Sequence, residues 1–169
     1  MSVLNILHYP DKRLRIKAKP VSAINREIRQ LINDMLDTMY QAPGIGLAAT
    51  QVNVHLRIIV IDISEDKNNP LVLINPEIIS LDGTEISDEG CLSVPDIYEP
   101  VERAEHIVVK TQTVENTKIE IDAHGILAVC IQHEMDHLIG KLFVDYLSEM
   151  KRSRIIKKLL KSQKMNETG

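Results

Sequence analysis

Two histidines spaced four residues apart offer the clearest chemistry in this sequence. His133 and His137 stand in the segment Gln-His-Glu-Met-Asp-His, with Glu134 directly after the first of them. On a helix, side chains four apart lie on one face about one turn from each other, where two imidazoles can hold one metal ion. Glu134 would lie at the flank of that face and could act as a base without binding the metal. The alternative is a pair of hydrogen-bonded core histidines, but the apolar surroundings would make unliganded histidines costly.

A catalytic metal site needs a third protein ligand and an open position. The extended motif of the metzincins would place glycine at position 140 and histidine at 143, and this chain has Gly140 but Phe143. A downstream acid could only be Glu149 or Glu167, and both stand in a charged segment that we expect to be exposed. The third ligand is therefore expected upstream of the two histidines.

Cys91 is the upstream candidate for this ligand. It stands in Glu-Gly-Cys-Leu-Ser, residues 89–93, a polar segment containing glycine that leads into an extended stretch. A thiolate with two imidazoles and water would complete a four-coordinate site. The alternative is a small buried apolar residue, which is the usual fate of a free cysteine. Cys130 fits that alternative better, because it lies on the apolar helix predicted around His133.

The elements that must position these residues can be predicted from periodicity. Apolar residues from Ile24 to Met39 have helical spacing, which Pro43 and Gly44 bring to an end, and a glycine-rich loop is expected over residues 44–51. Short strands are expected over residues 56–63, 71–75, 77–80, 84–88, 106–112 and 117–122. A buried helix is expected over residues 125–138, with Gly140 as its C-cap, and a further helix over about 148–165.

This order of elements predicts an α+β fold. We expect antiparallel sheets packed around a central helix that bears the His-Glu-x-x-His motif, with an N-terminal helix and a C-terminal basic helix. Residues 1–147 would form the catalytic domain and residues 148–169 a basic helix or tail. The first 20 residues, with Pro10 and Pro20, should form an extended arm with turns.

Composition excludes several classes of protein. The 169 residues are 44% hydrophobic and 26% charged with a net charge of −4, which is ordinary for a soluble globular protein and argues against a DNA-binding protein. Tryptophan is absent and aromatic residues make up 3%, which disfavours nucleic-acid binding by stacked aromatics. Two cysteines are no disulfide framework, and neither a signal peptide nor a membrane span is predicted. We expect a cytoplasmic protein that is not associated with a membrane.

Three segments, in this order and spacing, resemble the peptide deformylase family. They are Gly-Ile-Gly-Leu-Ala-Ala-Thr-Gln at 44–51, Glu-Gly-Cys-Leu-Ser at 89–93 and Gln-His-Glu-Met-Asp-His-Leu at 132–138. The opening Tyr9-Pro10-Asp11, Leu14-Arg15 and Pro20-Val21 are also similar, so the resemblance covers residues 3 to about 147. The family removes the formyl group from the N-terminal formyl-methionine of newly synthesised polypeptides, and the resemblance implies that activity here.

The resemblance also implies roles for individual residues. Cys91, His133 and His137 would bind one divalent metal ion, natively Fe²⁺, with Zn²⁺, Ni²⁺ or Co²⁺ able to replace it. Glu134 would be the general acid and base, and Gln51 with the backbone N–H of Leu92 would hold the developing oxyanion. The substrate would contact Ile45, Gly46, Gly90, Ile126, Val129 and Cys130, with Gly46 offering backbone hydrogen bonds and Ile45, Ile126, Val129 and Cys130 helping to wall the methionine pocket.

Other polar residues near the motifs invite weaker predictions. Tyr98 stands where several relatives carry arginine, so contacts to the substrate backbone should differ here. Arg103 either pairs with Glu89 to hold the Cys91 segment or is a solvated surface charge. Asp136 and Gln132 could support the metal ligands. No ligand spacing connects the remaining histidines, so surface or loop positions are expected for His8, His55, His106 and His124.

The C-terminal segment predicts a partner. Residues from Lys151 to Lys164 include seven basic residues and no acid, on a helix with an apolar side. This segment could simply pack its apolar side onto the domain, but related deformylases dock near the ribosomal exit by a C-terminal helix, which favours ribosome binding. The protein is expected to be a monomer.

Two other function classes compete with a deformylase. One is a metallohydrolase with the same ligands acting on another amide, such as a peptidase. The other is a structural metal module or a ribosome-associated protein without activity. A structural site uses four protein ligands and needs no base, so Glu134 argues against this second class.

Overall fold

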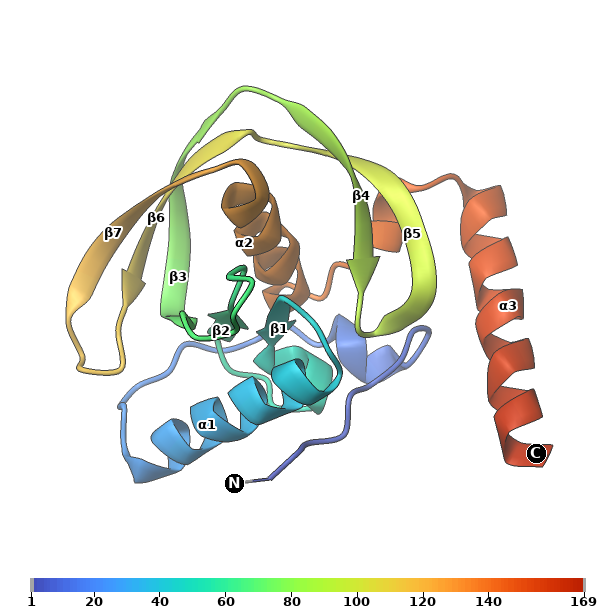
Figure 1. The fold of residues 1–169 in the computed structure, drawn as a ribbon, viewed down its shortest axis with the longest axis horizontal. Helices are drawn as coiled ribbons and strands as arrows, with labels where there is room; N and C mark the ends of the chain where they lie inside the picture. Colours follow the sequence, from blue (N-terminus) through green and yellow to red (C-terminus); the bar gives the residue numbers. More distant parts are fainter. Residues whose placement is uncertain (1, 169) are drawn as a thin grey trace.

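The computed structural model describes residues 2–168, with side chains up to Ser162, and has the α+β architecture that the sequence predicts. Within the described residues there are three α-helices, a five-stranded antiparallel sheet and a two-stranded antiparallel sheet. Figure 1 shows helix α2 in the space between the two sheets, with α1 below and α3 at one side. None of the described helices is long and apolar enough to cross a membrane.

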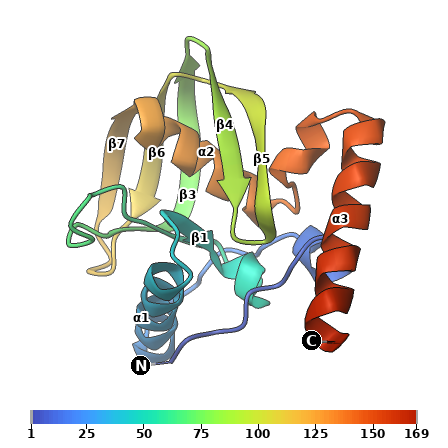
Figure 2. The same cartoon turned by 45° about the vertical axis from the view of Figure 1, so that its right-hand side comes forward.

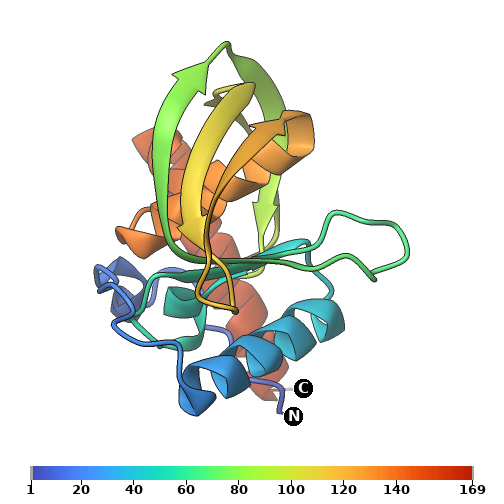
Figure 3. The same ribbon diagram turned by 90° about the vertical axis from the view of Figure 1, so that its left-hand side faces the viewer.

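The first helix, α1, spans Arg26–Gln41. Asn25 caps it, because its side chain accepts a hydrogen bond from the backbone N–H of Ile28. The apolar stripe predicted from the sequence faces inward, and Ile32, Met35 and Met39 are buried. They pack with residues of strands β1 and β2, so α1 closes one end of the larger sheet, as Figure 3 shows.

The larger sheet has the strand order β1-β2-β3-β6-β7. The strands are β1 Gly46–Ala48, β2 Ile58–Ile61, β3 Leu71–Asp82, β6 His106–Gln112 and β7 Lys118–His124. The two strands predicted over 71–75 and 77–80 are one continuous strand, β3. Pro76, which lacks an N–H, lies at a shift in the register between β3 and β6, so the chain stays extended through an irregularity.

The smaller sheet pairs β4, Glu85–Cys91, with β5, Val94–Arg103. Strand β5 was not predicted, because Pro95 and Pro100 indicate a break in a strand. A two-stranded sheet leaves one edge of each strand unpaired, and proline is accepted there. The segment around Cys91 is therefore the end of a strand and a tight turn.

The prediction of a glycine-rich loop over residues 44–51 is wrong. The segment contains strand β1 and a short 3-10 helix, η2, at Ala49–Val52. Leu47 and Ala48 are fully buried, and their backbone pairs with β2. The glycines led us to expect a loop, but the burial of the residues between and after them decides the structure.

Helix α2 spans Gly125–Leu138, the bounds that the sequence predicts. It is buried along most of its length and packs against β1, β2, β6 and β7. Figures 1 and 2 show it enclosed between the two sheets. Gly140 follows its end with a left-handed φ of +79°, and a side chain there would collide with the backbone carbonyl of Arg15.

The N-terminal arm packs against residues that lie far away in the sequence. It includes a short 3-10 helix, η1, at Lys12–Arg15. The guanidinium of Arg15 donates to the carbonyl of Gly140 and pairs with Asp145 at 2.7 Å. The backbone N–H of Ala18 donates to the carbonyl of Leu138. The arm therefore holds the C-terminal end of α2 in place.

The chain ends with a 3-10 helix, η3 at Phe143–Tyr146, and with α3 at Glu149–Thr168. Helix α3 runs beside β5 on the outside of the molecule (Figure 2). Ile155 on this helix is buried in a cluster with Val101 and Phe143, so α3 packs on the body of the protein by its apolar side.

Candidate metal centre

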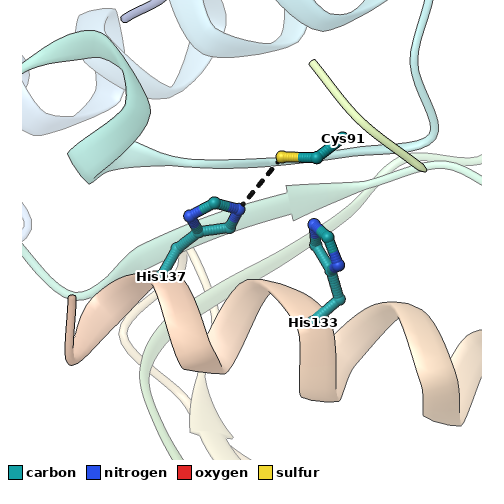
Figure 4. Close-up of side chains that lie close together, drawn as sticks. All are labelled: Cys91, His133 and His137. Atoms are coloured by element: carbon teal, nitrogen blue, oxygen red, sulfur yellow. Dashed lines mark hydrogen bonds between the residues drawn. The ribbon is translucent and has the colours of Figure 1, made fainter. Parts of the chain in front are cut away.

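Three side chains that can bind a metal ion lie close together, one from strand β4 and two from helix α2. Cys91 comes from the end of β4, and His133 and His137 come from successive turns of α2 (Figure 4). Cys91 Sγ lies 3.3 Å from Nε2 of His137, and one ligand atom from each residue lies within 4.8 Å of the other two. A thiol and two imidazoles in this arrangement form the donor set of a zinc-type or iron-type site.

The burial of this group requires an explanation. His137 has no exposed surface, and His133 and Glu134 are almost completely buried. Among the described residues, neither Oε1 of Glu134 nor Nδ1 of His137 has a hydrogen-bond partner. An unpartnered buried polar atom costs about 1–3 kcal/mol. Convergent soft and imidazole donors beside an unpartnered carboxylate oxygen fit a metal ion with its water, so the residues present suit a metal centre.

A buried ion pair fixes the orientation of His133. Because a carboxylate only accepts, Nδ1 of His133 donates to Oε1 of Glu89 at 2.8 Å, which leaves Nε2 free to face Cys91. Arg103 donates to both oxygens of Glu89, at 2.6 and 2.8 Å, and to Asp136 at 2.6 Å. Of the two alternatives for Arg103, the pair with Glu89 is correct. Asp136 acts on His133 indirectly, because it binds the arginine that holds Glu89 against the imidazole.

Gln132 has a different partner from the one we expected. Its side-chain amide donates to the carbonyl of Ala104 at 2.8 Å, and its side-chain oxygen accepts from the Ala104 N–H at 3.0 Å. Gln132 therefore fastens α2 to the chain between β5 and β6. It does not contact a candidate metal ligand through any hydrogen bond of the described residues.

The charges around the site favour a cation. Burial alone would raise the pKa of Glu89, but the hydrogen bonds from Arg103 and His133 outweigh burial and lower that pKa to about 2. Burial lowers the pKa of His133, but the acidic groups of Glu134 and Cys91 outweigh burial and raise it. A positive charge at this point, whether a proton or a metal ion, is therefore stabilised by its surroundings.

Glu134 and His137 are perturbed mainly by burial. Burial raises the pKa of Glu134 to about 7, and it lowers the pKa of His137. A neutral imidazole at His137 is the form that binds a metal ion. A carboxylate whose pKa lies near neutrality can both accept and release a proton.

Gln51 lies behind the cysteine. It stands on η2 and is almost completely buried. Its Oε1 accepts from the backbone N–H of Ala48 at 2.9 Å. Its Nε2 donates to Ser93 Oγ at 3.0 Å and lies 3.5 Å from Cys91 Sγ. The amide donor is thus oriented toward the metal centre, and Ser93, which the sequence analysis missed, orients it.

A cavity of about 1050 Å³ opens over the centre. Most of the predicted site residues line it: Ile45, Gly46, Gly90, Cys91, Leu92, Ile126, Val129, Cys130, His133 and Glu134. His137 and Gln51 do not line it, because both lie beneath its wall. The structure therefore brings the predicted residues together, with Gln51 and His137 in the layer behind the others.

Two glycines allow this cavity to have its shape. A side chain at Gly46 would collide with Oε2 of Glu134 and with Sγ of Cys130, so the backbone of β1 approaches the carboxylate closely. A side chain at Gly90 would collide with the ring of Tyr98. Tyr98 is largely exposed and lines the cavity. Its position over Gly90 has no sequence signal, because the two residues meet across the β4–β5 pair.

The chain is similar to known proteins along nearly its whole length. It matches the family model described as polypeptide deformylase over residues 3–153. A peptide deformylase of Nitrosococcus oceani is 60% identical over 166 residues, which cover 98% of this chain and 99% of that protein. One from Cellvibrio japonicus is 61% identical over 166 residues, covering 97% and 98%. The crystal structure of a peptide deformylase from Legionella pneumophila matches with a TM-score of 0.95 at 48% identity, covering 99% of each chain.

The Arg103 ion pairs should be essential for stability. Replacing Arg103 by Leu leaves the buried carboxylate of Glu89 without its partner, and we expect a loss of about 3–5 kcal/mol in the free energy of unfolding. The matched control is Arg15→Leu, which breaks the more exposed pair with Asp145 and should cost about 0.2–1 kcal/mol. Urea unfolding of the metal-free proteins, followed by circular dichroism, measures both. Equal losses would contradict the importance assigned to the buried pair.

Proposed function

The chain belongs to the polypeptide deformylase family, an enzyme family that removes the N-formyl group from nascent peptides by a metal-dependent hydrolysis, and from this premise we propose how its residues perform the reaction. The observation that supports the proposal is the convergence of Cys91, His133 and His137, with the first two and Glu134 lining one cavity and His137 behind them. Membership of this family excludes the two other function classes that the sequence left open, a peptidase and a structural metal module.

Cys91, His133 and His137 are the proposed metal ligands. When bound, the divalent metal activates a water molecule by lowering its pKa toward about 7. Glu89 keeps His133 oriented, with Nδ1 occupied and Nε2 directed at the cysteine. On the family resemblance we propose Fe²⁺ as the native ion. Zn²⁺, Ni²⁺ and Co²⁺ are proposed as possible replacements, because thiolate and imidazole suit all of these ions.

Glu134 is the proposed general base and acid. It stands between the two histidines in sequence, lines the cavity and has an oxygen, Oε1, without a hydrogen-bond partner among the described residues. Its carboxylate takes the proton released by water and then delivers it to the leaving amine of the peptide. This carboxylate therefore moves one proton twice in each turnover.

Gln51 and the backbone N–H of Leu92 are the proposed donors to the oxyanion. The Nε2 atom of Gln51 already points at Cys91 and is held by Ala48 and Ser93. Donors that are fixed before the reaction need no reorganisation when charge develops on the formyl oxygen. Removing one such donor typically costs about 2.7–4 kcal/mol of transition-state stabilisation.

The cavity walls are proposed to select a formylated methionine. Ile45, Ile126, Val129 and Cys130 form the apolar part of its lining and would surround the methionine side chain. Gly46 and Gly90, which both line the cavity, would offer backbone groups to an extended peptide. The close approach of Gly46 to Glu134 leaves little space beside the carboxylate. A formyl carbon carries only hydrogen, so a restricted space admits it and excludes larger acyl groups.

Helix α3 is proposed to bind the ribosome by its basic face, and the protein to act as a cytoplasmic monomer. Ile155 is buried against the body, whereas Lys157, Lys158 and Lys161 are exposed. The packing of the apolar side is therefore compatible with ribosome binding, because the two interactions use different faces of one helix. In this arrangement residues 148–169 form a docking segment on a catalytic domain of residues 1–147.

The metal ligands can be tested by comparing the two cysteines. Cys91→Ser should lower the bound metal per chain and the turnover of formyl-Met-Ala severely, because a hydroxyl is a poorer ligand than a thiolate for these ions. Cys130→Ser is the matched control, since Cys130 lines the same cavity but is not among the ligands. Metal analysis of both proteins, purified without oxygen, makes the measurement. Equal metal content in the two variants would refute Cys91 as a ligand.

The role of Glu134 can be separated from metal binding. Glu134→Gln keeps the size of the side chain but cannot accept a proton, so kcat should fall by about 10²–10⁴-fold while the metal content stays unchanged. Steady-state kinetics on a formyl-methionyl peptide and metal analysis are made on one preparation. If Glu134→Gln loses its metal, the residue is a ligand or a structural group and the proposed role is wrong.

The basic face of α3 can be tested without removing the helix, whose Ile155 is part of the core. Replacing Lys157, Lys158 and Lys161 by Gln should weaken ribosome co-sedimentation and lower the slope of log affinity against log salt by about 2. Turnover of a free peptide should not change. The control replaces the exposed Lys12, Lys110 and Lys118 by Gln and has the same change in net charge. Equal co-sedimentation of both triple variants would exclude docking through α3.

A further inference from the structure

A second group of metal-binding side chains lies on the face of the larger sheet, away from the cavity. Asp82 of β3, His106 of β6 and His124 of β7 are direct register partners across three neighbouring strands. Asp122 stands two residues before His124 on the same face of β7, because side chains alternate along a strand. Two imidazoles and two carboxylates are therefore placed together by the strand register alone.

The donor atoms of this group lie close enough together to share one ion. The imidazole rings of His106 and His124 are stacked, with centroids 4.0 Å apart and planes 2° from parallel, so the more exposed ring of His124 has to turn before both ring lone pairs point at one ion. The Oδ1 atom of Asp122 lies 2.6 Å from Nε2 of His106 and 3.2 Å from Nε2 of His124. One ligand atom from each of the three residues lies within 4.8 Å of the other two. Both ring Nε2 atoms thus face one carboxylate oxygen.

We propose that His106, His124 and Asp122 form a second metal site, selective for a borderline divalent ion of the Zn²⁺ class. Imidazole nitrogen with one carboxylate oxygen is a donor set that zinc accepts, with water in the remaining position. Imidazole also favours such ions over Mg²⁺ and Ca²⁺, which take oxygen ligands. The ion would displace the hydrogen that His106 and Asp122 share.

The surrounding charge supports a cation at this place. Asp82 lies 4.0 Å from Nδ1 of His106, and Glu105 lies 3.6 Å from Nδ1 of His124. These two acids add negative charge and can hold the outer ring nitrogens, as carboxylates do for metal-bound histidines. His124 is also the N-cap of α2, whose positive end opposes a cation. The carboxylates of Asp82, Glu105 and Asp122 together carry more negative charge than the partial positive charge at the N-terminal end of α2.

This site is separate from the catalytic centre. His124 precedes α2, whereas His133 stands nine residues further along the chain. At about 1.5 Å per residue, the two positions are roughly 14 Å apart along the helix axis. None of His106, His124 and Asp122 lines the cavity. Their side chains are 25%, 61% and 66% exposed, so an ion can reach them directly from solvent.

The test counts the Zn²⁺ ions that the full-length protein binds. In equilibrium dialysis against micromolar Zn²⁺, the wild type should bind two equivalents, and the double variant His106→Ala with His124→Ala should bind one. His55→Ala, which removes a histidine outside the group, should still bind two. Turnover of a formyl-methionyl peptide should be the same in all three proteins, so failure of this site is distinguishable from failure of the catalytic proposal.

A conservative variant and a spectroscopic probe keep the test independent of folding. Asp122→Asn should weaken the second equivalent by about tenfold or more, since losing a carboxylate partner of a metal site costs 10–100-fold in affinity. With the catalytic centre first filled by one equivalent of Zn²⁺ and Cu²⁺ then added as the probe, electron paramagnetic resonance should show nitrogen coupling that the double variant lacks. Equal numbers of bound Zn²⁺ in the wild type and the double variant, or identical Cu²⁺ spectra, would overturn the proposal.

Discussion

The position of the Arg103 guanidinium between two carboxylates is the constraint on which the rest of the site depends. Arg103 ends strand β5, Glu89 lies on β4 and Asp136 lies on α2, so one side chain joins the smaller sheet to the central helix. A buried charge without its partners is strongly destabilising, so the packing of the three elements loses much of its stability when one of the three residues is missing. Oε1 of Glu89, which also accepts from Arg103, is then directed at Nδ1 of His133, so the same ion pair that packs these elements also orients an imidazole.

This dependence explains why the site is divided between two layers. The groups that line the cavity, such as Glu134 and Cys91, come from elements that the ion pair joins. Gln51 and His137 lie behind them and are held by backbone and hydroxyl groups of their neighbours. Thr50 donates to the carbonyl of His137, so even the end of the central helix is tied to the 3-10 helix η2.

The sequence predicted those features that depend on spacing within one element. Helix α2 has the expected bounds, because its apolar run and Gly140 are local signals, and the two histidines on it are related by helical periodicity. Strand β5 was missed, since local signals at Pro95 and Pro100 outweighed a pairing that is set by a distant strand. Cys91 was reached by eliminating the downstream candidates and then by the family resemblance, because no periodicity relates residues more than forty positions apart. His106 and His124 show the same limit, since strand register brings them together and the sequence alone does not.

The N-terminal arm has a consequence for the way in which the chain is made. Arg15 contacts Gly140 and Asp145, and Ala18 bonds to Leu138, so residues at the start of the chain find their partners near its end. Contacts with such large sequence separation form late and slowly. During synthesis from the N-terminus, the arm and the end of α2 cannot meet until about 140 residues have left the ribosome. The enzyme therefore completes its own centre only when almost the whole chain has been translated.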